Sequence, residues 1–92
     1  MLNDPNFKIT IRSRSKLHYQ GMAVSLTSVN NTGKFDILGY HANFISLIKD
    51  YVLVVTSTES ASPLRFDITD GVIYVDNSEV HVYLNTVENL KH

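Results

Sequence analysis

The stretch GVIYVDNSEVHVYL, residues 71–84, is typical of two strands joined by a tight turn. Its centre is Asp-Asn-Ser at 76–78, and these residues favour turns because Asn tolerates a positive φ while Asp and Ser side chains bond back to the backbone. After the turn, Val80, Val82 and Leu84 alternate with polar or amphipathic side chains, which is the period of a half-buried strand. The stretch therefore predicts a β-hairpin with one buried face and one exposed face.

The same alternation recurs in the part of the chain that precedes this hairpin. It runs through FKITI at 7–11, MAVSL at 22–26 and LRFDI at 64–68. A further run, YVLVV at 51–55, is apolar on both faces and is typical of a strand covered from two sides. ANFISLI at 42–48 has apolar residues at helical spacing but is too short for an independent helix, so helix and strand are equally consistent with it. The side chains expected to point inward from the alternating runs are Phe7, Ile9, Ile11, Met22, Val24, Leu26, Leu64, Phe66 and Ile68.

Turn signals separate these runs and define the expected fold class. Short strands cut by closely spaced turns predict an all-β protein, an antiparallel β-sandwich of about 8–10 short strands. We expect a flexible N-terminus over 1–6, a single domain over 7–84, and a short polar tail that frays over 85–92. The turn signals are YQG at 19–21, NNTG at 30–33, STESASP at 57–63, TDG at 69–71 and DNS at 76–78.

The composition excludes several kinds of site and partner. The 92 residues suffice for one modest core, and the absence of cysteine excludes disulfides and thiolate metal sites. A net charge of −1 gives no electrostatic case for nucleic acid, and no apolar run approaches the ~20 residues of a membrane span. The first residues lack the order of a signal peptide, so we expect a cytosolic or matrix-like compartment. A locally basic start is interpreted as a solvated strand and turn rather than a phosphate-binding surface; its cations are Lys8, Arg12, Arg14 and Lys16.

Few residues could support catalysis or hold a cofactor. His41 could act as a general base oriented by Asp36, but no nucleophile motif accompanies them, and a lone histidine usually satisfies a loop hydrogen bond. The histidines form no metal-binding array, so zinc would need ligands from separate strands, and no phosphate loop is present. Tyr74 and Tyr83 could form an exposed binding patch or could cover strand edges. The residues favour a domain that binds a partner, without catalysis, metal or cofactor.

The order of the motifs carries further information. An opening strand leads to a short strand that ends at Gly21, and MAVSLTSV follows at 22–29. Next comes GKFDILGYHANF at 33–44, and FDITDGVIYVDNSEVHVYL at 66–84 supplies a strand, a glycine and the closing hairpin. This order, over 7–84, resembles the N-terminal β-sandwich of the F-type ATP synthase epsilon subunit, called delta in mitochondria. The 33–44 segment is similar to that family's Gly-x-(Phe/Leu)-Gly-Ile-Leu-x-x-His-Ala loop.

The resemblance implies a non-catalytic rotor subunit at the foot of the central stalk. Such a subunit packs against the gamma subunit and rests on the ring of c subunits, coupling proton transport to ATP synthesis. It belongs to a peripheral complex on the cytoplasmic face of the membrane, or its matrix or stromal equivalent, and does not itself enter the membrane. The implied c-ring contact loop comprises Gly33, Lys34, Asp36, Gly39, Tyr40 and His41, anchored in the core by Phe35, Ile37 and Leu38. The hairpin residues Tyr74, His81 and Tyr83 are the expected surface for gamma.

The chain departs from the family pattern at several points. Gly39-Tyr40 stands where the family has Pro-Gly, and Asp36 stands where it has glycine. Lys34 replaces a commonly acidic residue that faces basic loops of the c ring, so the partner must have changed as well. The family's C-terminal helical hairpin has no counterpart, so its regulation and ATP binding are not expected here. Two alternatives remain: a binding module that lost the rotor role, and a small enzyme or ligand carrier with a pocket beside His41.

Overall fold

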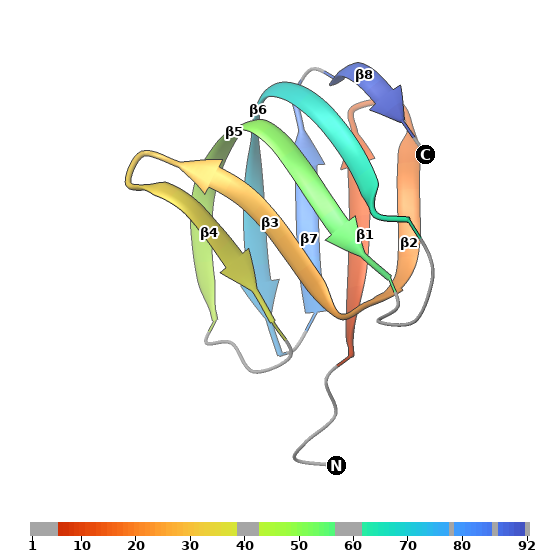
Figure 1. Ribbon diagram of the computed structural model, residues 1–92, viewed down its shortest axis with the longest axis vertical. Helices are drawn as coiled ribbons and strands as arrows, with labels where there is room; N and C mark the ends of the chain where they lie inside the picture. The colour runs from red at the N-terminus through yellow and green to blue at the C-terminus, as the bar shows by residue number, and fades with distance from the viewer. Residues whose placement is uncertain (1–5, 39–42, 57–61, 78, 86, 92) are drawn as a thin grey trace.

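The chain folds into strands alone over the residues that the structure describes. The computed structural model describes residues 6–38, 43–56, 62–77, 79–85 and 87–91 (Figure 1). No helix in these ranges is long and apolar enough to cross a membrane. The strands are β1 (Phe7–Ser13), β2 (Leu17–Ala23), β3 (Ser25–Asn30), β4 (Gly33–Ile37), β5 (Phe44–Val55), β6 (Leu64–Asp76), β7 (Glu79–Leu84) and β8 (Val87–Lys91).

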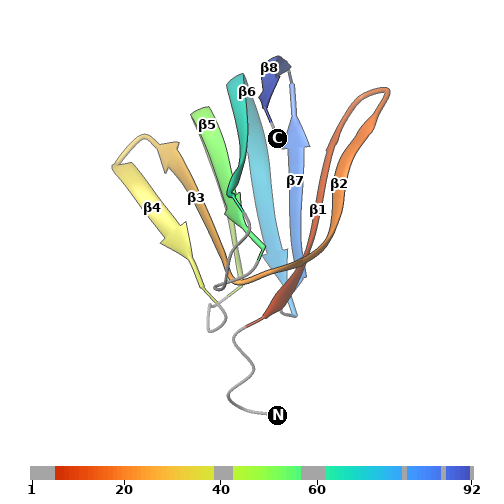
Figure 2. The ribbon, with the colours of Figure 1, turned by 45° about the vertical axis from the view of Figure 1, so that its right-hand side comes forward.

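Two long strands, β5 and β6, connect two layers. They pair with each other along their whole length, with a shift of register between Lys49 and Asp50, and Asp50 has a φ of 74°. On one side of this shift, the first half of β5 and the second half of β6 continue into β7, β1 and β2, which we name sheet I. On the other side, the remaining halves continue into β3, β4 and β8, which we name sheet II. Figure 2 shows the two layers facing each other.

The predicted β-sandwich is confirmed, but the sheet is mixed rather than purely antiparallel. β1 and β7 run parallel, with Ile9 opposite Val80 and Ile11 opposite Val82. A parallel pair needs a long connection between its strands, and here the intervening strands β2 to β6 supply it. Alternation of apolar residues predicts a strand but carries no information about the direction of its neighbour, which explains the difference.

The core fills the space between the two sheets. In the runs 7–11, 64–68 and 80–84, every second residue from the first onward points inward as predicted, except that Leu64 is only partly buried. Phe35 and Phe44 pack at the edge of this core, with ring centroids 6.3 Å apart at 79°. The buried apolar side chains are Phe7, Ile9, Ile11, Ala23, Leu26, Ile37, Ile48, Val52, Val54, Phe66, Ile68, Ile73, Val75, Val80, Val82 and Leu84.

The predicted hairpin of residues 71–84 is present as β6 and β7. Gly71 pairs with Leu84 and Asp76 with Glu79, and Asn77 in the turn has a φ of 51°, as its position in the sequence suggested. The ambiguous run at 42–48 forms the start of β5, not a helix. The YVLVV run is the end of β5; its outward side chains are only half-buried.

The strand predicted over MAVSL is wrong in its details. β2 ends at Ala23 and β3 begins at Ser25, so Val24 forms the connection from sheet I to sheet II. Its N–H donates to the carbonyl of Val55. Because the chain changes sheets here, a single alternation does not continue through it. Ala23 is buried in place of Met22, which is 49% exposed.

Two of the predicted turns lie inside strands. YQG at 19–21 belongs to β2, and TDG at 69–71 belongs to β6. The turn at 30–33 is confirmed, with Gly33 at a φ of 122°. The signal at 57–63 falls mostly outside the described residues. Part of the segment expected as a tail forms β8, whose backbone pairs with the first half of β6.

Candidate interaction surface

The outer face of sheet I carries a cluster of exposed apolar side chains. Ile45 and Leu47 in β5 are 68% and 70% exposed. Strand register places Ile45 opposite Tyr74, Leu47 opposite Val72, and Val72 opposite Tyr83 of β7. These five residues form a continuous surface, which we name the apolar patch. Because soluble proteins seldom leave large neighbouring apolar side chains in water, such a patch indicates an interaction site.

One end of the apolar patch is hollowed. A recess of about 440 Å³ is lined by Leu47, Val72 and Tyr83 of the patch, with Leu84 and Asp70 beside them. The recess offers apolar walls with one carboxylate, Asp70, at the margin. Its form suits the insertion of a side chain from another protein, as occurs at the centre of many protein interfaces.

The predicted surface of Tyr74, His81 and Tyr83 is brought together by the hairpin. Tyr74 and His81 lie opposite each other, and their rings stack with centroids 6.0 Å apart at 29°. Tyr83 follows two residues later on the same face of β7. Nε2 of His81 lies 3.7 Å from Oε1 of Glu79, a contact that becomes an ion pair when the imidazole is protonated.

The apolar partners of these tyrosines in β5 were not predicted. Ile45 and Leu47 alternate with Phe44, Ser46 and Ile48, and a strand interpretation would have placed them on one face. The run remained ambiguous because Phe44 and Ile48 also stand at helical spacing. The signal was therefore present but could not be separated from that of a short helix.

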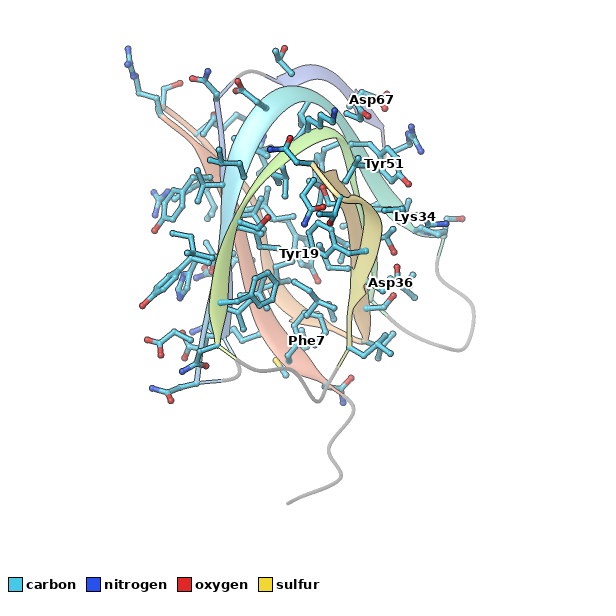
Figure 3. All side chains as sticks on the ribbon, turned by 90° about the vertical axis from the view of Figure 1, so that its left-hand side faces the viewer. Phe7, Tyr19, Lys34, Asp36, Tyr51 and Asp67 are labelled. Carbon is cyan, nitrogen blue, oxygen red and sulfur yellow. The ribbon has the colours of Figure 1, made fainter. Side chains whose placement is uncertain are left out.

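The outer face of sheet II is of a different kind. Nε of Arg65 lies 2.9 Å from Oδ1 of Asp67, and the Arg65 guanidinium lies 4.5 Å from the centre of the Tyr51 ring. Figure 3 shows Tyr51, Asp67, Lys34 and Asp36 along this side of the molecule. Arg65 is thus held by both Asp67 and Tyr51, whereas Lys34 is exposed.

The predicted c-ring contact set is divided between a strand and residues outside the described part. Gly33, Lys34 and Asp36 lie in β4, at the edge of sheet II, and not in a loop. Gly39, Tyr40 and His41 lie outside the described residues. At ~3.3 Å per residue, the two ends of β4 are roughly 13 Å apart, so Gly33 and Ile37 lie at opposite ends of the strand.

The anchoring of this segment is confirmed for two of its three predicted residues. Ile37 is 2% exposed and Phe35 packs against the core, but Leu38 is 56% exposed. β4 ends at Ile37, so alternation places the next residue outward. Asp36 accepts a hydrogen bond from Oγ1 of Thr27, its partner in β3, which holds the carboxylate on the outer face of sheet II.

The described histidines and carboxylates do not gather into a metal-binding cluster. Among them, no group of three or more His, Asp or Glu side chains could hold a metal ion. His18 is partly buried, with Nε2 3.0 Å from Oγ of Ser13 and its ring tilted against Phe66. Burial, and secondly the positive charge of Lys16, lower the pKa of His18 below its ordinary value. These contacts give His18 a structural place in the core margin.

Comparison with known families identifies the domain. A family model described as the beta-sandwich domain of the ATP synthase delta/epsilon chain matches residues 6–90. The chain belongs to this family. The predicted resemblance is thereby confirmed, and it extends over nearly the whole sequence. A search of curated protein sequences found no match.

Solved structures share the fold of this family member. One is a chain of the Euglena gracilis mitochondrial ATP synthase, solved as OSCP/F1/c-ring, with a TM-score of 0.79 and 15% identity over 91% of this chain. Another is from the central stalk and c ring of the Tetrahymena thermophila mitochondrial ATP synthase, with a TM-score of 0.71 and 13% identity over 89% of this chain. The match spans 53% of the Euglena chain and 65% of the Tetrahymena chain.

Proposed function

We propose that the chain is a non-catalytic central-stalk subunit of an F-type ATP synthase that docks the gamma subunit through the apolar patch. Membership of the delta/epsilon family supports the stalk role. The observation that carries the docking surface is the contrast between the outer faces of the two sheets. Sheet I exposes Ile45, Leu47 and Tyr74 together, whereas the outer face of sheet II carries the Arg65–Asp67 ion pair. A permanent interface in a rotor resembles an obligate one, which is mostly apolar at its centre.

The fold suits a mechanical role without chemistry. β5 and β6 run through both sheets, so a force applied to the outer face of sheet I reaches sheet II through continuous strands. The closely packed core between the sheets resists relative motion of the layers because protein interiors have low compressibility. The domain therefore transmits torque between gamma and the c ring without loss in a flexible joint.

Contact with the c ring is proposed for the residues around β4. This contact would use Gly33, Lys34 and Asp36 together with Gly39, Tyr40 and His41. Lys34 is exposed, so its ammonium group is available to a partner. A carboxylate on the ring facing Lys34 would complete the charge reversal noted in the sequence. The complex would be peripheral, on the cytoplasmic face of the membrane or its matrix or stromal equivalent.

A second candidate is a protein-binding module that keeps the sandwich but has left the rotor. The observation that favours it is Lys34, whose charge is opposite to the family pattern at an exposed position. Both candidates use the apolar patch, and they differ in the partner that covers it.

The test is capture of the tagged chain from its own host, with identification of the retained proteins by mass spectrometry. Retention of gamma together with the alpha and beta subunits supports the stalk role, and retention of an unrelated partner without ATPase subunits overturns it. Leu47→Asp should then weaken binding to purified gamma by about tenfold or more, because it places a charge at an apolar interface. Leu38→Asp is the matched control, since Leu38 is also exposed but follows a strand of sheet II.

A further inference from the structure

A second recess, of about 280 Å³, lies beside the apolar patch on the outer face of sheet I. Unlike the first, its lining is mainly polar. Tyr83 belongs both to this recess and to the apolar patch, so the two surfaces meet at β7. The other lining residues are Lys8, Thr10 and Arg12 of β1, Gln20 of β2, and Glu79 and His81 of β7.

Strand register explains why these polar groups gather. Thr10 of β1 lies opposite Gln20 on one side and His81 on the other. Arg12 lies opposite Tyr83, which in turn lies opposite Val72 of the apolar patch. Adjacent strands are ~4.8 Å apart, so the basic side chains of β1 stand only two strands from the apolar side chains of β6. A single docked segment can therefore contact both.

The charge of the recess is net positive and only partly compensated. Lys8 and Arg12 are exposed, and neither has an ion-pair partner among the residues that the structure describes. Glu79 lies opposite Lys8 in the parallel pair, but the contact that its carboxylate makes with a basic side chain is with His81, at 3.7 Å. On the other sheet, by contrast, Arg65 is held by both Asp67 and Tyr51.

We propose that this recess binds carboxylate side chains of the same protein segment that covers the apolar patch. The partner segment thus carries an apolar stripe flanked on one side by Asp or Glu. The guanidinium of Arg12 offers a planar pair of donors that matches a carboxylate, and Lys8 adds a second positive charge. The inference rests on the proposed docking function and specifies the chemistry of the partner at that surface.

The experiment measures the affinity of purified gamma from the chain's own host for three charge-reversal variants. Arg12→Glu and Lys8→Glu alter the recess, and Arg14→Glu is the matched control. Arg14 is exposed in the turn after β1 and changes the net charge equally. We expect the two recess variants to weaken binding by about tenfold at low salt, and less at high salt, because salt screens exposed charges. Thermal melts verify that each variant is folded.

The outcomes separate this inference from the function on which it rests. An equal effect of Arg14→Glu would indicate general attraction by net charge and would overturn the role of the recess. Unchanged binding of gamma by Arg12→Glu and Lys8→Glu would also overturn it, while leaving the docking function intact. Failure of the wild-type chain to bind gamma would remove both. Inorganic phosphate is the final probe: NMR shifts at Lys8 and Arg12 that saturate below about 1 mM, without loss of gamma binding, would assign the recess to a free anion instead.

Discussion

Gly71 lies inside β6, where the backbone of β7 leaves no space for a side chain. A Cβ at this position would stand 2.5 Å from the carbonyl oxygen of Tyr83 and 3.3 Å from Cα of Leu84. Both neighbours are main-chain atoms of a paired strand, so they cannot move without disturbing the hairpin. Gly71 is therefore required for close packing and not for a turn.

We expect Gly71→Ala to lower the free energy of unfolding by about 2 kcal/mol, within the range for overpacked sites. Gly21→Ala is the matched control: its Cβ would stand 2.8 Å from the Tyr19 hydroxyl, the far end of a side chain that can shift. The stability loss of each variant is measured from its urea unfolding midpoint, provided that the dependence of the unfolding free energy on urea is unchanged. Equal losses for the two variants would show that the close approach at Gly71 is not the cause.

We expect the stability of the domain to depend on pH through His18. Its pKa is lowered in the folded state, first by burial and then by Lys16, so folding favours the neutral imidazole. The contribution of His18 to the free energy of unfolding is therefore fully present above its unfolded pKa of about 6.5. This contribution decreases as the pH falls below that value, since the unfolded chain then binds more protons.

The measurement is the difference in unfolding free energy between about pH 7.5 and 5.5, for the wild type and for His18→Gln. This pH range stays above the usual pKa values of carboxyl groups. We expect a smaller difference in the variant, because glutamine does not titrate. The same slope in both proteins would assign the pH dependence to other groups.

At the scale of the element, the anchoring of β4 in the core depends on the inward residue Ile37 and not on the next residue, Leu38. Ile37 is fully enclosed between the sheets, whereas Leu38 faces outward. Ile37→Ala should cost about 2–5 kcal/mol and could unfold the domain, while Leu38→Ala should stay within about 0.5 kcal/mol. Chemical denaturation of both variants measures this. A loss below about 0.5 kcal/mol for Ile37→Ala would show that β4 is not anchored as described.

The strands that were best predicted from the sequence are those whose residue pattern is consistent with only one structure. In β7, the alternation of Val80 and Val82 with His81 coincides with a turn at Asn77, and both agree with the structure. Glycine has two uses, a turn or a close approach, and the sequence alone does not distinguish them. For this reason Gly21 and Gly71 were misassigned to turns while Gly33 was assigned correctly.

The candidate surface was predicted only where it lies on that hairpin. Tyr74 and His81 were placed together correctly because the turn defines their register. Ile45 joins them from a strand some thirty residues earlier in the chain, and Lys8 and Arg12 join from β1 through the parallel pairing with β7. Local patterns do not determine which strands become neighbours, so these contributions required the three-dimensional structure.

For the whole molecule, the sharing of β5 and β6 between the sheets has a consequence for cooperativity. Neither sheet can lose its packing without exposing the inner face of the other, so the domain should unfold as one unit. The proposed stalk role needs this property, because a sheet that opened independently would break the proposed connection between gamma and the c ring.

Ile9→Val in β1 and Ile37→Val in β4 test the cooperativity with matched changes in the two sheets. Both side chains are buried, so each variant should lose about 1 kcal/mol, typical of this substitution. Hydrogen exchange followed by NMR reports the opening free energy of each strand. We expect each substitution to lower the values of the slowest amides in both sheets by the same amount, since these amides exchange through global unfolding. If Ile9→Val affected β1, β2 and β7 but left β3 unchanged, the two sheets would be separate units, and the proposed transmission of torque through β5 and β6 would lose its physical basis.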